Sequence, residues 1–328
     1  MNLTLVVNPW ASAYKPKRRQ LVEETLGAGH QLTVIETTHR NHATELAREA
    51  AAQGAHVVVV LGGDGTLNEA ANGLVGTSTA LAPLPGGSTN VFCRTVGFNR
   101  KLRKAVVQMR AALDLPPRQI GLGSVNGRYF LFHVGMGYDA AVVEKVEGKA
   151  ALKRKIGQAV FVWAALAVWG GGFDRKRPHL AVQPGGGDGD GDGSGDGNGD
   201  GNGDGDGNVA VPDGYFAICL NSNPYTYLGV RPLQVAPGDA ALDRPLVLVT
   251  LRTIKLFKFL PLLGSTLGKG RKLKRSPVVD YRPDLKEVTV VSAEGRPSFP
   301  YQADGDFLGS TDRLSFTWEP DRLLLIAP

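Results

Sequence analysis

The fold of the first third of the chain is decided by residues 57–69, which read VVVVLGGDGTLNE. The five apolar residues from Val57 to Leu61 are typical of a parallel strand that is buried on both faces. A glycine-rich turn follows, and a helix is expected over Thr66–Leu74. Glycines let backbone amides approach phosphate oxygens closely, and a helix N-terminus adds free N–H groups with partial positive charge. The stretch therefore predicts a phosphate-binding loop.

Two polar side chains of this loop indicate chemistry. Thr66 can cap the helix or donate its hydroxyl to a phosphate. Asp64 would be repelled by a phosphate, so its presence makes sense if it holds Mg²⁺, directly or through water, or accepts a proton. The simpler alternative is a strand-to-helix turn whose glycines only make it tight. The succession of glycines, an acid and a hydroxyl favours the functional interpretation.

The flanking sequence alternates between strand and helix signals. Further strands are expected at Leu3–Val7, Gln31–Glu36 and Ala80–Leu84. Helices are expected at Lys17–Leu26 and at Asn41–Ala52, with Asn41 as the capping residue. This alternation predicts an α/β domain with a parallel sheet covered by helices.

Two more loops follow strands of this sheet. Residues 83–90, PLPGGSTN, come after one strand, and residues 8–12, NPWAS, come after the first strand and are a weak signal by themselves. Neighbouring parallel strands deliver their C-terminal loops to the same edge, so the glycine-and-hydroxyl loops could face one nucleotide across a crevice. A plain proline-glycine turn is the alternative for residues 83–90.

The pattern changes after about Arg118. Asn126-Gly127 lies between two apolar stretches and predicts a hairpin. The remaining runs predict a mostly antiparallel, β-rich second domain, so we divide the chain into residues 1–122 and 123–328. The expected strands are Tyr215–Leu220, Leu246–Leu251, Glu287–Val291, Arg313–Trp318 and Arg322–Ile326. Helices are expected within Lys149–Trp169 and Ile254–Leu263.

Residues 184–208 are almost entirely glycine, aspartate and asparagine. The tract has no apolar residue to bury, which predicts a disordered loop. Its neighbours, Leu180–Gln183 and Val209–Val211, resemble strand ends, so the loop is expected to be inserted into a hairpin. Calcium-binding repeats need a periodic large apolar residue, and this tract has none.

The net charge of +6 favours anionic partners, either nucleic acid or the anionic face of a membrane. No RNA-binding, zinc or homeodomain pattern is found, so we expect no nucleic acid partner. The longest apolar run, Ile156–Trp169, is shorter than the roughly 20 residues of a spanning helix. Two distant cysteines and a start typical of a strand rather than a signal peptide favour the cytoplasm.

Two stretches combine basic and apolar residues, Lys149–Trp169 and Lys255–Arg275. Such a combination is typical of a helix that lies at a membrane interface, so we expect peripheral association with a membrane surface. The alternative is that both are core-packing helices with solvated basic ends.

The ordered set of motifs resembles the diacylglycerol kinase catalytic-domain family, which includes bacterial lipid kinases and the sphingosine kinases. The resemblance covers nearly the whole chain outside the glycine-rich tract. GGDGT alone is shared with NAD kinases and resembles a loop of phosphofructokinases, but the ordered set is more specific. Its members are Asn8-Pro9, Thr37 ahead of Arg40-Asn41-His42-Ala43, GGDGTLNE at 62–69, PGGSTN at 85–90, GMGYDA at 135–140, NSNP at 221–224 and Asp304-Gly305-Asp306.

The resemblance implies a Rossmann-like N-terminal domain that binds ATP with Mg²⁺, a β-rich domain that holds a membrane lipid, and catalysis in the cleft between them. Diacylglycerol is the favoured acceptor, which would give phosphatidic acid. The alternatives are a sphingoid base or other lipid, a soluble NAD-like acceptor, and a catalytically weak nucleotide-binding regulator. A homodimer is left open.

Residue roles follow from the same resemblance. The nucleotide contacts would be Asn8, Ser12, Thr37, Gly62, Gly63, Asp64, Gly65, Thr66, Leu67, Asn68 and Ser88. Asp306 stands where the family usually has a glutamate that accepts the proton, and Asp304 and Asp64 are the other catalytic candidates. Taken alone, Asp304-Gly305-Asp306 would more simply be a type I turn between two strands. Asp239 and Asp243 could hold an accessory Mg²⁺, although Arg244, Pro245 and Val247 replace typical residues of that stretch.

Overall fold

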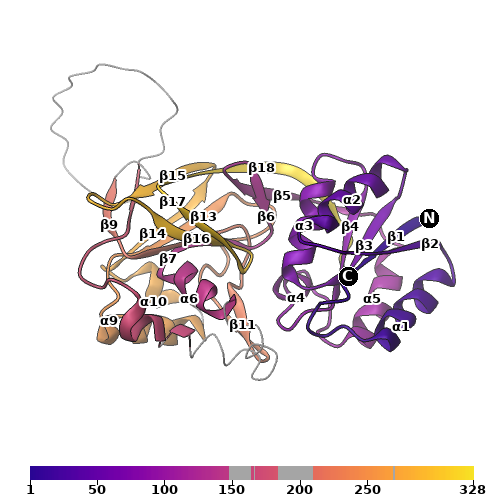
Figure 1. Cartoon of the computed structure of the whole chain (residues 1–328), viewed down its shortest axis with the longest axis horizontal. Coiled ribbons are helices and arrows are strands. Elements are labelled where there is room, and N and C mark those ends of the chain that lie inside the picture. The colour runs from indigo at the N-terminus through magenta and orange to yellow at the C-terminus, as the bar shows by residue number, and fades with distance from the viewer. Residues whose placement is uncertain (148–163, 166, 184–209, 269) are drawn as a thin grey trace, which may run out of the picture.

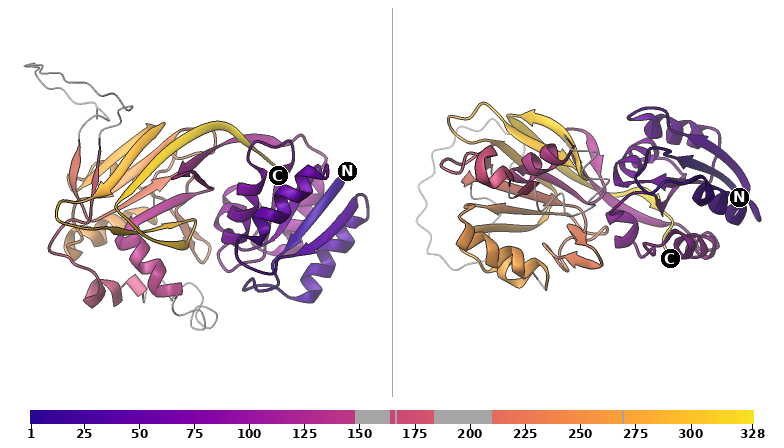
Figure 2. Two further views of the ribbon diagram at one scale, coloured as in Figure 1. Left: turned by 45° about the horizontal axis from the view of Figure 1, so that its top comes forward. Right: turned by 60° about the horizontal axis from the view of Figure 1, so that its bottom comes forward.

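The computed structural model describes residues 1–147, 164–165, 167–183, 210–268 and 270–328. The tract predicted to be disordered, residues 184–208, lies outside the described residues, as does most of the predicted helix Lys149–Trp169. The chain forms two lobes, which are joined by long strands that run from one to the other (Figure 1). Figure 2 shows the same two lobes from other directions.

The N-terminal lobe is the predicted parallel sheet. Its strands lie in the order β2-β1-β3-β4, and the pairs β1–β2, β1–β3 and β3–β4 are all parallel. All six residues of β3 are buried, as its continuous apolar run predicts. The bounds are β1 (Asn2–Val7), β2 (Gln31–Glu36), β3 (Val57–Gly62) and β4 (Ala80–Pro85).

Helices cover both faces of this sheet. Residues of α2 and α3 pack in one core cluster with Val58 and Val60, whereas residues of α1 and α5 pack in another with Val57 and Val59. Adjacent positions of β3 therefore serve opposite cores. The bounds are α1 (Pro16–Gly27), α2 (His42–Ala52), α3 (Asp64–Leu74), α4 (Val91–Thr95) and α5 (Leu102–Ala112).

Two details of the predicted helix starts are wrong. Helix α3 begins at Asp64, with Gly63 at the N-cap position, so Thr66 lies inside the first turn and does not cap it. Asn41 does stand at the N-cap of α2, but its backbone is left-handed (φ 65°) and its side chain makes no capping hydrogen bond. Asparagine tolerates this conformation better than most residues, which accounts for its use there.

The C-terminal lobe is built on a six-stranded sheet with the order β14-β13-β10-β7-β16-β17. Every pair in it is antiparallel, as predicted. The bounds are β7 (His133–Gly137), β10 (Phe216–Leu220), β13 (Leu246–Leu251), β14 (Val279–Leu285), β16 (Phe299–Ala303) and β17 (Asp306–Thr311).

One face of this sheet packs on the continuation of the first sheet. Val134 and Leu248 share a core cluster with Val290 and Phe316 of that continuation. The other face is covered by helices, because Ile218 and Val247 cluster with residues of α6 and α9. The continuation comprises β5 (Arg118–Val125), β6 (Arg128–Phe130), β8 (Leu180–Val182), β9 (Val211–Gly214), β15 (Glu287–Ser292) and β18 (Arg313–Leu325).

Shorter elements complete this lobe. A two-stranded hairpin, β11 (Thr226–Leu228) with β12 (Arg231–Leu233), lies between the lobes in Figure 1. The helices are α6 (Tyr138–Glu147), the π-helical turn η1 (Val168–Gly172), α9 (Leu256–Thr266) and α10 (Arg271–Lys274).

The predicted hairpins are present. Asn126 and Gly127 both have positive φ, 47° and 82°, and connect β5 to β6. Strands β8 and β9, which flank the glycine-rich tract, pair antiparallel. The two strands expected near the C-terminus form one strand instead, β18, with an irregularity between Glu319 and Leu323.

Strand β18 also ties the lobes together. It pairs with β15 and β5, and its last residue, Leu325, pairs with Leu81 of β4. The C-terminus thereby returns to the N-terminal lobe. The boundary that we predict between residues 122 and 123 falls inside β5.

Helices α2 and α3 pack too closely for any side chain at Gly73. A Cβ there would lie 2.4 Å from the carbonyl oxygen of Thr44 and 3.0 Å from Cβ of Ala47. We expect Gly73→Ala to lower the free energy of unfolding by about 1–3 kcal/mol, despite the helix propensity of alanine. Urea unfolding measures this. The matched control is Gly264→Ala in α9, where a Cβ meets open space and stability should stay equal or rise. Equal effects of the two variants would contradict the packing argument.

Candidate active site

Three loops meet at the edge of the parallel sheet where the strands end. The N–H of Gly86 donates to the carbonyl of Gly62 (2.9 Å), and the N–H of Asn8 donates to the carbonyl of Leu61 (3.1 Å). A Cβ on Gly86 would lie 2.8 Å from the nitrogen of Gly62, and one on Gly87 would lie 2.7 Å from Cα of Gly63. The two glycine-rich loops therefore pack backbone against backbone, which no other residue at 86 or 87 permits.

Side chains of the loop at residues 8–12 and of the loop at residues 62–69 are hydrogen-bonded to each other as well. The side-chain Nδ2 of Asn8 donates to Oγ1 of Thr66 (2.8 Å), and the side-chain Oδ1 of Asn8 accepts the backbone N–H of Trp10 (2.9 Å). Since Thr66 accepts this bond, its own hydroxyl hydrogen remains to be donated elsewhere. Asn8 thus holds the loop in shape, and Thr66 can donate to a phosphate.

The carboxylate of Asp64 caps the next helix. It accepts the backbone N–H groups of Val91 (3.0 Å) and Phe92 (3.2 Å) at the N-terminus of α4. The partial positive charge of that helix end offsets the negative charge that would otherwise repel a phosphate.

The other expected nucleotide contacts fall into two groups. Ser12 and Ser88 are exposed and line a pocket of about 930 Å³, together with Thr89 and the basic side chains of Lys17 and Arg18. In contrast, the side chains of Thr37, Leu67 and Asn68 are buried, and Leu67 packs in the core between the sheet and its helices. A direct contact to a ligand from the Leu67 side chain is excluded by that packing.

Asn68 joins the two lobes. Its amide donates to Oδ2 of Asp304 (2.8 Å) and to the carbonyl of Tyr129 (3.0 Å), and its carbonyl accepts from the guanidinium of Arg128 (2.8 Å). All its hydrogen-bonding groups are engaged within the protein, so Asn68 positions the lobes.

Asp304 is the partner of Asn68 and is only 3% exposed. Its carboxylate also accepts the backbone N–H groups of Leu131 (2.7 Å), Phe132 (2.9 Å) and His133 (3.1 Å). Burial raises the pKa of Asp304 to about 6, although all four hydrogen bonds lower it. A carboxylate so fully engaged is well placed to hold structure and poorly placed to take a substrate proton.

The turn around Asp304 differs from the expected type I turn. Asp304 and Gly305 have φ of 50° and 85°, which is the left-handed pattern of a type I′ turn between β16 and β17. The turn presents Asp306 to the other lobe. Its Oδ2 would lie only 2.6 Å from a Cβ built on Gly65, so the carboxylate of one lobe lies against the predicted phosphate-binding loop of the other.

A buried network behind Asp306 was missed by the sequence analysis. Asp139 accepts hydrogen bonds from the hydroxyl of Tyr225 (2.5 Å) and the amide of Gln302 (2.8 Å). Gln302 in turn accepts the N–H of Gly305 (2.8 Å), next to Asp306. Burial raises the pKa of Asp139, and these two hydrogen bonds oppose the effect. The motif GMGYDA at 135–140 was the available signal, but it did not indicate a role for Asp139.

The predicted accessory metal site does not fit its residues. The Asp239 carboxylate forms an ion pair with Lys274 and accepts the hydroxyl of Tyr281 (2.5 Å). Burial raises the pKa of Asp239, but these partners outweigh it and the net pKa is below its ordinary value. An ammonium group therefore stands where a cation would be needed, and Asp243 is exposed.

Among the described residues, three side chains of types that can bind a metal ion lie close together: His39, His42 and Glu45. Nδ1 of His42 accepts the N–H of Thr38 (2.9 Å), and Nδ1 of His39 bonds the carbonyl of Arg40 (2.9 Å). The lone pair on Nδ1 of His42 is therefore already used.

Part of the chain matches the model of a known protein family. Residues 2–146 match the family model of the diacylglycerol kinase catalytic domain. This segment is similar to that domain. It contains all three loops and Asp139, whereas Asp304 and Asp306 lie beyond it in sequence.

Two curated relatives support the same assignment. A probable lipid kinase, YegS-like, from Chromohalobacter salexigens is 34% identical over 163 residues, which cover 48% of this chain and 51% of the relative. A diacylglycerol kinase from Bacillus subtilis is 32% identical over 162 residues, covering 48% and 52%. The chain thus spans about half the length of the curated relatives that it matches.

The fold extends over the whole chain in solved structures. A candidate diacylglycerol kinase from Bacillus anthracis superposes with a TM-score of 0.73 at 20% identity, covering all of this chain and 97% of that one. A second diacylglycerol kinase structure from the same organism gives a TM-score of 0.65 at 17% identity. No helix within the described residues is long and apolar enough to cross a membrane.

Asp304 and Asp306 share one turn, and the protein should respond differently to the loss of each charge. Asp304→Asn places an amide where four N–H groups need an acceptor, so we expect the free energy of unfolding to fall by about 1–3 kcal/mol. Thermal unfolding at neutral pH measures this, with Asp306→Asn as the matched control. Equal melting temperatures for Asp304→Asn and the wild type would contradict the structural role.

The effect of Asp304→Asn on stability should also depend on pH. Because the folded pKa of Asp304, about 6, exceeds its unfolded value of roughly 4, the folded protein binds the extra proton between these pH values. This group's contribution to stability is complete below pH ~4 and is lost as the pH rises through ~6. The stability of the wild type relative to Asp304→Asn should therefore be greatest below pH ~4 and should fall as the pH rises through ~6.

Proposed function

We propose that the protein is an ATP-dependent lipid kinase, with diacylglycerol as the favoured acceptor. The observation that carries the proposal is the approach of Asp306 to Gly65, within 2.6 Å of where a Cβ would stand. It brings a carboxylate from one lobe to the N-terminus of α3 in the other. A phosphate donor on the loop and a hydroxyl beside the carboxylate would then lie in line for transfer.

The nucleotide is held by the N-terminal lobe. The first turn of α3 has N–H groups without partners inside the helix, and such groups can donate to phosphate oxygens. Thr66 and Ser88 add hydroxyl donors, and Lys17 and Arg18 add positive charge. Asp64 offers the kind of oxygen ligand that Mg²⁺ prefers, and Mg²⁺ bound with ATP would neutralise charge on the phosphates.

Asp306 acts as the general base. A lipid hydroxyl is a poor nucleophile, so Asp306 takes its proton as the oxygen bonds to the γ-phosphorus and the bond to the β-phosphate oxygen breaks. The products are the phosphorylated lipid, ADP and the proton on the carboxylate. Asp139, Gln302 and Gly305 support the turn from behind, so the base is held by its own lobe.

The acceptor is a lipid because α9 offers a membrane-binding face. Phe257, Leu260, Leu263 and Leu267 are 70%, 51%, 42% and 46% exposed and recur at helical spacing along one side. Lys255 and Lys258 flank this apolar face. Leu262, on the opposite side, is buried in the core of the lobe. Helix α9, which lies within Lys255–Arg275, thus has one face that packs on the core and another that is exposed, as an interfacial helix requires.

The base assignment is tested by Asp306→Asn. An amide has nearly the same shape but cannot take the hydroxyl proton, so kcat on diacylglycerol vesicles should fall by about 10²–10⁴-fold. Calorimetric ATP affinity should change little, because the phosphate-binding groups lie in the other lobe. A fall in kcat of less than about tenfold would exclude Asp306 as the base. Running the same assay with sphingoid bases and with NAD separates the alternative acceptors.

The membrane face is tested by Phe257→Ser combined with Leu260→Ser. Burying one large apolar side chain in the interface contributes about 1.5–3 kcal/mol, so vesicle affinity should fall at least tenfold. Vesicle co-sedimentation measures the change. Val107→Ser, on α5 and 67% exposed, removes a comparable apolar group elsewhere and should not alter binding. Equal binding by the double variant and the wild type would rule α9 out.

A further inference from the structure

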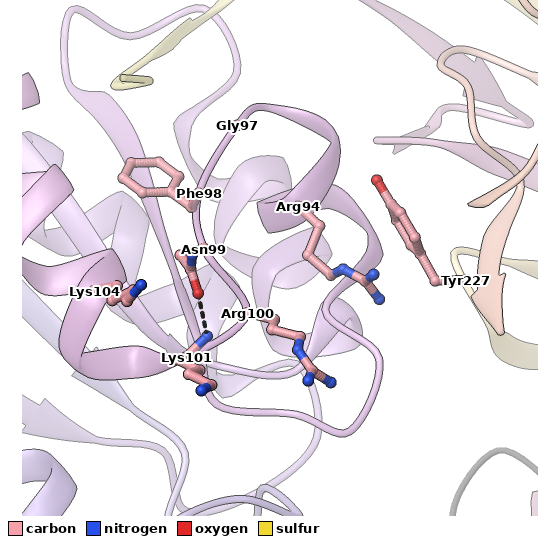
Figure 3. Close-up of a pocket in the computed structure, with 8 residues that line it drawn as sticks. All are labelled: Arg94, Gly97, Phe98, Asn99, Arg100, Lys101, Lys104 and Tyr227. Carbon is pink, nitrogen blue, oxygen red and sulfur yellow. Dashed lines mark hydrogen bonds between the residues drawn. The ribbon is translucent and has the colours of Figure 1, made fainter. Parts of the chain in front are cut away.

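A second pocket lies between the lobes, beyond the α4 end of the candidate active site. It is a shallow, open depression with a volume of about 440 Å³, bordered by the segment from α4 to α5 and by the hairpin strand β11 (Figure 3). We call it the basic pocket. It is lined by Arg94, Gly97, Phe98, Asn99, Arg100, Lys101, Lys104 and Tyr227.

The lining of the basic pocket carries four cationic side chains and no acid. The structure shows no ion pair between these four side chains and any described carboxylate. Partial burial lowers the pKa of Arg94, and the nearby charge of Arg100 lowers it further, although Tyr227 and Asp64 oppose the effect. Like charges gathered in this way repel each other, and a bound anion would relieve that repulsion.

Arg94 is held ready to bind. Its guanidinium carbon lies 3.4 Å from the centroid of the Tyr227 ring, so residues of both lobes stack against each other (Figure 3). Stacking covers the flat face of a guanidinium and leaves its N–H edge for an acceptor such as phosphate.

The loop beside Arg94 is also fixed. The side chain of Gln108 accepts the N–H of Asn99 (2.8 Å) and donates to the carbonyl of Gly97 (3.3 Å). The Asn99 side chain accepts the N–H of Lys101 (3.0 Å). Arg100 and Lys101 are therefore presented by a segment with a defined shape, which reduces the ordering that binding requires.

We propose that the basic pocket binds a phosphate group that is separate from the phosphates of the nucleotide. Two sources share this chemistry, the headgroup of an anionic phospholipid and free phosphate. The position favours the headgroup, because α4, the β11–β12 hairpin and α9 lie along the same lower side of the molecule in Figure 1. Leu228 and Val230 at the hairpin are exposed, by 39% and 65%, beside the pocket.

The basic pocket lies next to the pocket of about 930 Å³ that is lined by the expected nucleotide contacts Ser12 and Ser88. The two pockets share Arg94, Arg100 and Lys101. Lys104 lines only the basic pocket, whereas its neighbour Arg103 lines only the larger one. Lys104 therefore provides the clean test. Arg110 lies on the same helix, is exposed and lines neither pocket, so it is the matched control for general charge.

The experiment compares Lys104→Gln and Arg110→Gln in the full chain. Binding is measured to phosphatidylcholine vesicles with and without phosphatidylglycerol, and to inorganic phosphate by calorimetry, with ATP affinity measured in parallel. A basic residue near an anionic surface contributes about 1 kcal/mol, so Lys104→Gln should weaken binding to the anionic vesicles about fivefold. Arg110→Gln should weaken it clearly less, and neither variant should alter ATP affinity.

The outcomes separate the sources and the rival explanations. Loss of vesicle binding alone identifies a lipid headgroup, and a matching loss of phosphate binding identifies free phosphate as a ligand too. Equal losses in Lys104→Gln and Arg110→Gln would overturn the proposal in favour of a diffuse charge effect. Weaker ATP binding in Lys104→Gln with unchanged phosphate and vesicle binding would overturn it in favour of the nucleotide. These readouts do not require turnover, so they stand apart from the kinase proposal.

Tyr227 tests the stacking without changing charge. Tyr227→Phe keeps the aromatic face and should bind anionic vesicles as the wild type does. Tyr227→Leu removes the stack under Arg94 and should weaken binding roughly threefold, which corresponds to an ordinary cation–π contribution. Equal binding by both variants would overturn the role of the stacked Arg94 in the pocket.

Discussion

The contact between Asp304 and Asn68 is the constraint on which the arrangement of the two lobes depends. A carboxylate that is 3% exposed is costly to bury unless hydrogen bonds replace the lost water. Three backbone N–H groups of its own lobe and the Asn68 amide of the other supply those bonds. Because one of the four donors comes from α3, Asp304 is fully satisfied only when the lobes meet in this one register.

That register sets the position of the candidate base. Asp306 follows Asp304 by two residues, and the type I′ turn between them fixes the direction in which β17 leaves. The same α3 that supplies Asn68 carries Gly65 one turn earlier. A shift in the contact between Asn68 and Asp304 would therefore also change the distance between Asp306 and the predicted phosphate-binding loop.

The elements of the fold were largely predictable because their signals are local. The bounds of Gln31–Glu36 and Leu246–Leu251 were predicted as the structure has them, since apolar runs between turn residues report burial directly. The convergence of the three loops followed from the parallel sheet alone. The start of α3 was misplaced by two residues, because glycines in a first turn hide the helix from any propensity argument.

The functions of single polar side chains were less predictable because they depend on distant partners. Asn68 and Asp304 are 236 residues apart, and nothing near either one shows that they bond. Lys274 likewise neutralises Asp239 from a separate helix, which no local pattern of acids could indicate. The resemblance named these positions, but the physical role of each depends on contacts that only the folded chain makes.

Asp64 shows how the chain can place an acid inside a phosphate-binding loop. In a simple anion site both helix ends near the ligand would keep their N–H groups free. Here α4 gives two of its N–H groups to Asp64, so α3 is left as the helix whose N-terminus can face the phosphates. Helix α4 also carries Arg94 of the basic pocket, about one turn further along, where it stacks on Tyr227 of the other lobe. Helix α4 thus contacts Asp64 at its N-terminus and lines the basic pocket with Arg94. A movement of α4 would therefore displace groups at both places.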